Sequence, residues 1–158
     1  MTAVEFHTGV EDPLAYACRL LRKASRQRAR VAVAGPAPLM ERLDTLLWTF
    51  DSTSFVAHRR ARPGEGEAPE DPTDIWLIDV DESGEAGTQG LKSALTGEGP
   101  EVLLNLGDEA VGHPDGWRRI IELVPGDPAG KQRARQRWRA YEGFGLAPAA
   151  RAVQEAAG

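Results

Sequence analysis

The chain has 158 residues, of which 41% are hydrophobic, and a formal net charge of −5 at pH 7. This length predicts one globular domain, spanning residues 1–158, that buries about two-thirds of its unfolded surface. No run of about 18 apolar residues is present, so no transmembrane helix is expected. One cysteine and three scattered histidines cannot form an internal disulfide and do not form a metal-ligand set. We therefore expect a cytoplasmic protein with no metal, no cofactor and no membrane partner.

The first part of the chain alternates strand and helix patterns. The mixed segment AVEFHT predicts a strand over 3–8, and Asp12 followed by Pro13 predicts the N-cap and first residue of a helix. The run RVAVAGP predicts a buried strand over 30–36 that ends in a Gly-Pro turn. Apolar residues at helical spacing then predict an amphipathic helix over 37–49.

Further strands are predicted from short apolar runs in the second part of the chain. These strands lie at 54–58, 74–80, 101–107 and 118–126, and a basic helix starting near residue 131 follows them. The segment 63–74 predicts an acidic loop, because proline, glycine and like charges bury little apolar surface. The segment 147–158 predicts a weakly structured tail.

The strand and helix alternation predicts the fold class. Runs such as DIWLIDV are apolar at almost every position, which is typical of strands covered on both faces. We therefore predict an α/β fold of the Rossmann-like kind, a doubly wound and mainly parallel sheet with helices on both faces.

Enzyme motifs are absent from this sequence, and no catalytic residue is predicted. It has no GxGxxG, no GxxxxGK[ST] and no GxSxG. Gly35 is followed by Pro36, which removes an amide that a phosphate would need. Asp79, Asp81 and Glu82 could hold Mg²⁺ at the end of a strand, but nothing completes that site, and a solvated strand end explains them as well.

Basic residues gather in the segment KQRARQRWRAYEGF, which starts at Lys131. Its first nine residues contain five basic side chains and no acidic one. On a helical wheel Lys131, Arg135, Trp138 and Arg139 fall within one sector of about 80–100°.

The residues around that sector have different predicted environments. Ala134 and Tyr141 lie beside it, toward the expected core. Arg133 and Arg137 point elsewhere and are predicted to be ordinary solvated charges.

Three cations spaced four residues apart around one indole ring suit an acidic peptide with an apolar end. The alternative is that Trp138 is a core residue and the arginines merely surround it. A stacked nucleic-acid base would also suit the ring, although the net negative charge of the chain disfavours general nucleic-acid binding.

Two segments resemble one family. KQRARQRWRAYEGFGL resembles the C-terminal signature of the chi subunit of bacterial DNA polymerase III holoenzyme, a basic aromatic helix followed by a glycine-phenylalanine turn. RVAVAGPAPLMERLDTLLWTFDSTSFVAH is similar to the strand, helix and strand that occur earlier in that family, and RRIIELVP also matches its place there.

The resemblance implies a non-catalytic accessory subunit of the clamp-loader assembly, with a doubly wound α/β fold. It implies binding to the acidic, phenylalanine-ended C-terminal tail of single-stranded DNA-binding protein, and hence indirect contact with single-stranded DNA. The tail-binding cations of the family fall on Lys131, Arg135 and Arg139. Its aromatic residue, usually tyrosine, falls on Trp138, which lacks the hydroxyl but offers a larger apolar ring.

The resemblance also implies binding to the small psi subunit. The matching positions are Trp48 and Phe55, for which a place in the core is the alternative. Ala57 stands where the family usually has proline.

Two other functions compete with this one. The first is a single-stranded nucleic-acid-binding protein that uses both basic segments, 19–30 with six basic residues and 131–139 with five. The second is a small nucleotide-using enzyme with a degenerate phosphate loop.

Overall fold

The computed structural model describes residues 2–49, 56, 58–61, 75–80, 101–112 and 114–153. The elements in chain order are β1 (Ala3–Val10), α1 (Pro13–Arg26), β2 (Val31–Pro36), α2 (Ala37–Thr49), β3 (Arg59–Ala61), β4 (Ile75–Val80), β5 (Val102–Asn105), the 3₁₀ turn η1 (Pro114–Gly116), β6 (Arg119–Pro125), α4 (Pro128–Gly143) and β7 (Ala149–Ala152). The predicted acidic loop 63–74 and the carboxylates Asp81 and Glu82 lie outside the described residues.

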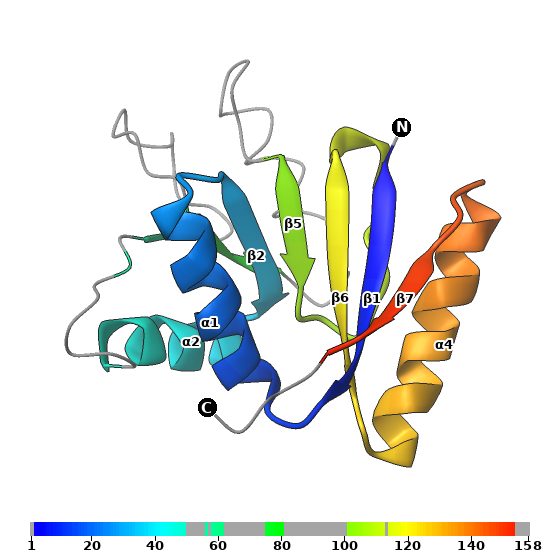
Figure 1. The fold of residues 1–158 in the computed structure, drawn as a ribbon, viewed down its shortest axis with the longest axis horizontal. Helices are drawn as coiled ribbons and strands as arrows, with labels where there is room; N and C mark the ends of the chain where they lie inside the picture. Colours follow the sequence, from blue (N-terminus) through cyan, green and yellow to red (C-terminus); the bar gives the residue numbers. More distant parts are fainter. Residues whose placement is uncertain are drawn as a thin grey trace.

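The strands form one seven-stranded sheet in the order β3-β4-β2-β5-β6-β1-β7. Every described strand pair is parallel. Helix α1 joins β1 to β2 across two intervening strands, and α4 joins β6 to β7 across β1. Figure 1 shows α1 and α2 near one side of the sheet and α4 near the other.

Two apolar layers account for the buried strands. Alternate residues of β2 and β4 enter different layers: Val33 and Leu77 pack with α1 and α2, whereas Ala34 and Ile78 belong to the layer that contains residues of α4. Strands buried on both faces have no polar face, which is why their sequences read as continuous apolar runs. The predicted doubly wound, parallel α/β fold is confirmed.

The capping prediction for the first helix is also confirmed. Asp12 is the N-cap of α1 and accepts a hydrogen bond from the amide of Ala15 at 3.2 Å, with Pro13 as the first helical residue. Proline is tolerated there because the first amides of a helix have no intrahelical acceptor. The helix predicted over 37–49 is α2.

Two local predictions differ from the structure. The strand predicted over 54–58 begins later, because Val56 and His58 are not in a strand and β3 starts at Arg59. Residues 149–152, expected in a weakly structured tail, form β7 and pair with residues 5–8 of β1. All four β7 residues are exposed, so no hydrophobic alternation in the sequence marks this strand.

Candidate partner-peptide interface on helix α4

Helix α4 has defined ends that fix its direction and length. The carboxylate of Asp127 accepts a hydrogen bond from the amide of Gly130 at 2.9 Å and caps the N-terminus. A Cβ at Gly130 would lie 2.9 Å from Asp127 Oδ1 and 3.0 Å from the Pro125 ring, so this position suits glycine. At the other end, Gly145 has φ +83° and the amide of Leu146 donates to the carbonyl of Tyr141 at 3.1 Å. Between these two ends α4 is one continuous helix, so positions four residues apart lie on the same side of it.

The inner face of α4 is a stripe of four buried residues, Gly130, Ala134, Arg137 and Tyr141. Ala134 and Tyr141 were predicted to face the core, and this is confirmed. The prediction that Arg137 is an ordinary solvated charge is wrong. Its side chain is 6% exposed, and its Nε donates to Glu122 Oε1 of β6 at 2.8 Å.

Glu122 is the centre of a buried polar cluster. It is fully buried and accepts hydrogen bonds from Arg137, from the Tyr141 hydroxyl at 2.5 Å and from the Asn105 amide at 2.8 Å. Burial raises the pKa of Glu122 above its ordinary value of 4.5, while the Arg137 charge and the hydrogen bonds oppose that rise. Burial and the neighbouring carboxylate also raise the pKa of the Tyr141 phenol, which keeps its proton and donates. This cluster anchors the inner face of α4 to β6.

Trp138 lies at the boundary between the core and the solvent. Its side chain is partly buried, and its ring centroid is 5.0 Å from that of Phe6 of β1, with an interplanar angle of 47°. Phe6 also meets Tyr141 edge to face, with the ring centroids 6.0 Å apart. The indole therefore rests on a buried aromatic ring while part of its own surface stays exposed. It is neither a fully buried core residue nor a free surface side chain.

The three cations of the predicted interface all lie on α4 and are exposed. Lys131, Arg135 and Arg139 are spaced by four residues along one uninterrupted helix, so they lie along one side of it. Among the described residues, no carboxylate forms an ion pair with any of these three. Arg133 instead has its Nε 3.5 Å from Asp108 Oδ1, in an exposed pair. The cationic surface next to Trp138 is therefore available to an external anion.

Phe144 adds apolar surface that the sequence reasoning did not include in the site. It is the C-cap residue of α4, and 53% of it is exposed. Its amide donates to the carbonyls of Ala140 and Tyr141, which holds the backbone in the turn after the helix. The signal in the sequence was a phenylalanine placed between two glycines directly after a basic amphipathic helix, where little core is available to cover it.

Trp48 lies in a second exposed surface, at the end of α2. The residue is 60% exposed, so the alternative of a core residue is wrong. Its ring meets that of His58 edge to face at 5.7 Å. Both nitrogens of His58 face acceptors, the Val56 carbonyl at 2.7 Å and the Asp44 carboxylate at 2.5 Å, which hold the ring against Trp48. Phe55, the other residue predicted for this surface, lies outside the described residues.

Comparisons with known proteins place this chain in a family. Residues 1–149 match the family described as DNA polymerase III chi subunit, HolC. The chain is also 35% identical over 147 residues to the DNA polymerase III subunit chi of Pseudomonas aeruginosa, covering 89% of this chain and 89% of the relative. The chain belongs to the DNA polymerase III chi subunit family.

Membership of the chi family makes the chain a subunit of DNA polymerase III and a DNA replication protein. The resemblance identified from the sequence is thereby confirmed. The matched range includes α4 and its terminal turn, as well as α2 with Trp48. In the part of the chain that the structure describes, no helix has the length and apolar character needed to span a membrane.

Proposed function

We propose that this chi-family chain is a non-catalytic accessory subunit of the clamp-loader assembly that binds the acidic C-terminal tail of single-stranded DNA-binding protein. The observation that carries the proposal is the outer surface of α4, where Lys131, Arg135 and Arg139 are exposed beside the partly buried Trp138 and have no carboxylate partner among the described residues. A tail of carboxylates that ends in phenylalanine complements both parts of this surface.

Each part of the tail would have a different partner on α4. The acidic side chains meet the row of cations, where exposed ion pairs contribute about 0–1 kcal/mol each. The terminal phenylalanine packs on the exposed part of the indole, which Phe6 supports from below. Its carboxylate meets the guanidinium of Arg139, the exposed cation that directly follows Trp138. We expect most of the binding energy to come from this apolar and carboxylate end.

A peptide that copies the tail should bind the purified chain with modest affinity, because a disordered tail must be ordered on binding. Replacing Trp138 or Arg139 with alanine should weaken binding about tenfold, which corresponds to about 1.4 kcal/mol for the loss of one anchoring residue. Isothermal titration calorimetry measures both effects. Added salt should weaken the complex without abolishing it, because the apolar anchor is not screened.

Arg133→Ala is the matched control for this experiment. It removes the same charge from the same helix, but Arg133 belongs to the exposed pair with Asp108. We expect its effect on peptide affinity to be less than about twofold. If Arg133→Ala weakens the peptide as much as Arg139→Ala, the helix is a diffuse charged surface and the proposed site is wrong.

Direct single-stranded DNA binding is the second candidate function. The exposed cations of α4 favour it, and the formal net charge of −5 opposes it. A titration with an oligonucleotide in the absence of protein partners separates the two candidates. Salt-sensitive binding of the oligonucleotide that is tighter than binding of the tail peptide would favour this function over the proposed one.

The candidate of a nucleotide-using enzyme has little structural support. The first turns of α1 and α4 both begin with proline, and their amides at Ala15 and Gly130 already bond the carboxylates of Asp12 and Asp127. A phosphate at either helix start would meet a negative charge of the chain itself. Asp79 is also engaged, because Arg60 donates to both of its carboxylate oxygens at 2.9 Å.

We further propose that the surface around Trp48 binds the psi subunit. Replacing Trp48 with alanine should abolish co-purification with psi, because a large exposed aromatic side chain is a frequent anchor of protein interfaces. The free energy of unfolding should change by less than about 0.5 kcal/mol, as at other surface sites. Thr49→Ala, at the next exposed position of α2, is the control. Psi binding that survives Trp48→Ala would contradict this assignment.

A further inference from the structure

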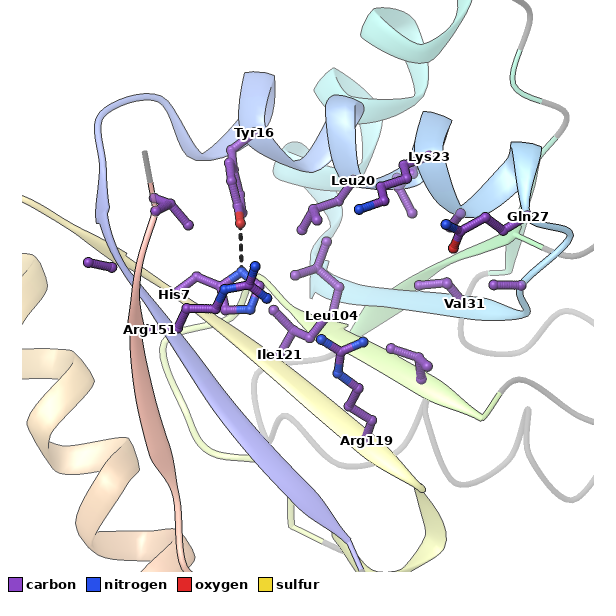
Figure 2. Close-up of a pocket in the computed structure, with 16 residues that line it drawn as sticks. His7, Tyr16, Leu20, Lys23, Gln27, Val31, Leu104, Arg119, Ile121 and Arg151 are labelled. Carbon is purple, nitrogen blue, oxygen red and sulfur yellow. Dashed lines mark hydrogen bonds between the residues drawn. The ribbon is translucent and has the colours of Figure 1, made fainter. Parts of the chain in front are cut away.

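A cavity of about 620 Å³ opens on the face of the sheet that carries α1. Its apolar floor includes Leu104 of β5 and Ile121 of β6, and Leu20 of α1 forms part of the opposite wall. Figure 2 shows this space between α1 on one side and the strands on the other. The volume lies within the range of about 300–1,000 Å³ that is typical of small-ligand sites. Because α4 packs with the other apolar layer, this cavity is separate from the proposed peptide interface.

The charged residues in the described lining of the cavity all have the same sign. Lys23 of α1, Arg119 of β6 and Arg151 of β7 are cations, and no aspartate or glutamate is among the described residues that line it. Within the described part of the chain, no carboxylate pairs with Lys23 or Arg151. Lys23 and Arg151, together with Arg119, which already pairs with Glu5, surround one apolar floor and form a local site for an anion in a chain with a formal net charge of −5.

Arg119 has an unused hydrogen-bond donor at this place. One of its terminal nitrogens donates to Glu5 Oε2 at 2.5 Å, but its Nε is buried and has no hydrogen-bond partner among the described residues. Figure 2 shows the side chain extending from β6 toward Leu104 and Ile121, so the guanidinium lies beside the apolar floor. A buried donor without an acceptor is costly, and rotation of the 39% exposed side chain would bring this donor to an oxygen of a bound anion.

His7 and Tyr16 fix the opposite end of the cavity. His7 Nε2 lies 3.2 Å from Glu5 Oε2, and its Nδ1 lies 2.6 Å from the Tyr16 hydroxyl, the hydrogen bond drawn in Figure 2. Burial, helped by the charges of Arg119 and Arg151, lowers the pKa of His7, and the Glu5 carboxylate opposes this. The neutral ring then donates from Nε2 to Glu5 and accepts at Nδ1 from Tyr16. His7 thus holds Tyr16 at the wall and adds no positive charge.

We propose that this cavity binds an amphipathic organic anion, with a carboxylate or phosphate head between Arg119, Arg151 and Lys23 and an apolar body on Leu104 and Ile121. The head supplies an acceptor for Arg119 and the negative charge that Lys23 and Arg151 lack among the described residues. The body covers the floor between β5 and α1. The site is independent of the proposed peptide interface on α4.

The test uses four probes with the same ten-carbon chain and the full-length protein. Decanoate and decyl phosphate are the anions, and decanol and decylammonium are the neutral and cationic controls. We expect both anions to bind and to shift amide resonances of β5, β6 and α1 in NMR titrations, with decyl phosphate favoured if a doubly charged head is required. Equal binding of decanol or decylammonium, or no binding of either anion, would overturn the proposal.

Variants locate the head group. Lys23→Ala and Arg151→Ala should each weaken binding of decanoate about two- to fivefold, since both cations are exposed. Arg119→Lys keeps a charge but removes Nε, and should weaken it further. Arg26→Ala is the control, because Arg26 is an exposed cation of α1 outside the cavity lining. An equal loss with Arg26→Ala would show only a general charge effect and overturn the proposal.

Peptide titrations separate this site from the proposed function. The tail peptide should leave the resonances of Leu104 and Ile121 unchanged, and Arg151→Ala should leave peptide affinity unchanged. If the tail peptide displaces decanoate, the cavity is a peptide site and the proposal of an organic-anion site fails. If the peptide does not bind α4 but decanoate still binds the cavity, the proposed function fails and the organic-anion site stands.

Discussion

Replacing Arg137 with alanine is expected to lower the free energy of unfolding by about 3–5 kcal/mol. Arg137 is the only cation that forms an ion pair with Glu122 in the described part of the chain, and their side chains are 6% and 0% exposed. Without the guanidinium, Glu122 keeps its hydrogen bonds from Tyr141 and Asn105 but loses the compensating charge. An uncompensated buried carboxylate is far more costly than the loss of an exposed ion pair. Urea unfolding at pH 7 measures the difference.

The pH dependence of this loss has a defined sign. A carboxyl group whose folded pKa is raised is destabilising when ionised, so its penalty grows as pH rises above the unfolded value of about 4.5. Loss of the Arg137 charge removes an effect that lowers the folded pKa of Glu122. We therefore expect the deficit of Arg137→Ala to be smaller at pH 5 than at pH 7.

Arg133→Ala is the control for stability as well as for binding. It lies on the same helix, but its pair with Asp108 is exposed, so its effect should stay below about 0.5 kcal/mol. Equal stabilities of the two variants would contradict the structural role assigned to Arg137.

Arg133 and Arg137 show which features of this site the sequence predicts: the exposed position of Arg133 was predicted correctly, and the buried position of Arg137 was not. The helix, its basic outer surface and the inward direction of Ala134 and Tyr141 follow from helical spacing. The same spacing places Arg137 on the inner stripe, three residues after Ala134 and four before Tyr141, but its charge favoured a solvated assignment. The missing signal was Glu122, an acidic residue inside the apolar strand IIELV that needs a buried cation.

The fold was predictable from the sequence, whereas the cavity was not. Strands β2 and β4 are apolar at nearly every position because both faces are covered, and such local patterns are visible in the sequence. The charged lining of the cavity comes from Lys23, Arg119 and Arg151, which are far apart in the chain. The pairing of β6 and β7 with β1 brings both arginines to the lining of one cavity, with Arg119 opposite Ala3 and Arg151 opposite His7. No local pattern predicts that arrangement, and β7 itself has no apolar periodicity.

Replacing Phe6 with alanine should affect both stability and the proposed function. Phe6 is 2% exposed and its ring meets those of Trp138 and Tyr141, so we expect a loss of about 3–5 kcal/mol in the free energy of unfolding. The cavity left behind removes the surface on which the indole rests. Trp138 should then sample more orientations, and the tail peptide should bind about tenfold more weakly, the same loss that we expect when the indole itself is removed.

Leu43→Ala separates the two effects of the Phe6 substitution. Leu43 is fully buried in α2, in the apolar layer on the other face of the sheet, and its truncation should cost about 2–5 kcal/mol. Both variants are compared by calorimetry at a temperature where circular dichroism shows that each is folded. Peptide affinity should fall for Phe6→Ala and stay unchanged for Leu43→Ala, because only Phe6 lies beneath Trp138. An equal fall in both would mean that peptide binding follows overall stability, and that the aromatic contact between β1 and α4 does not organise the interface.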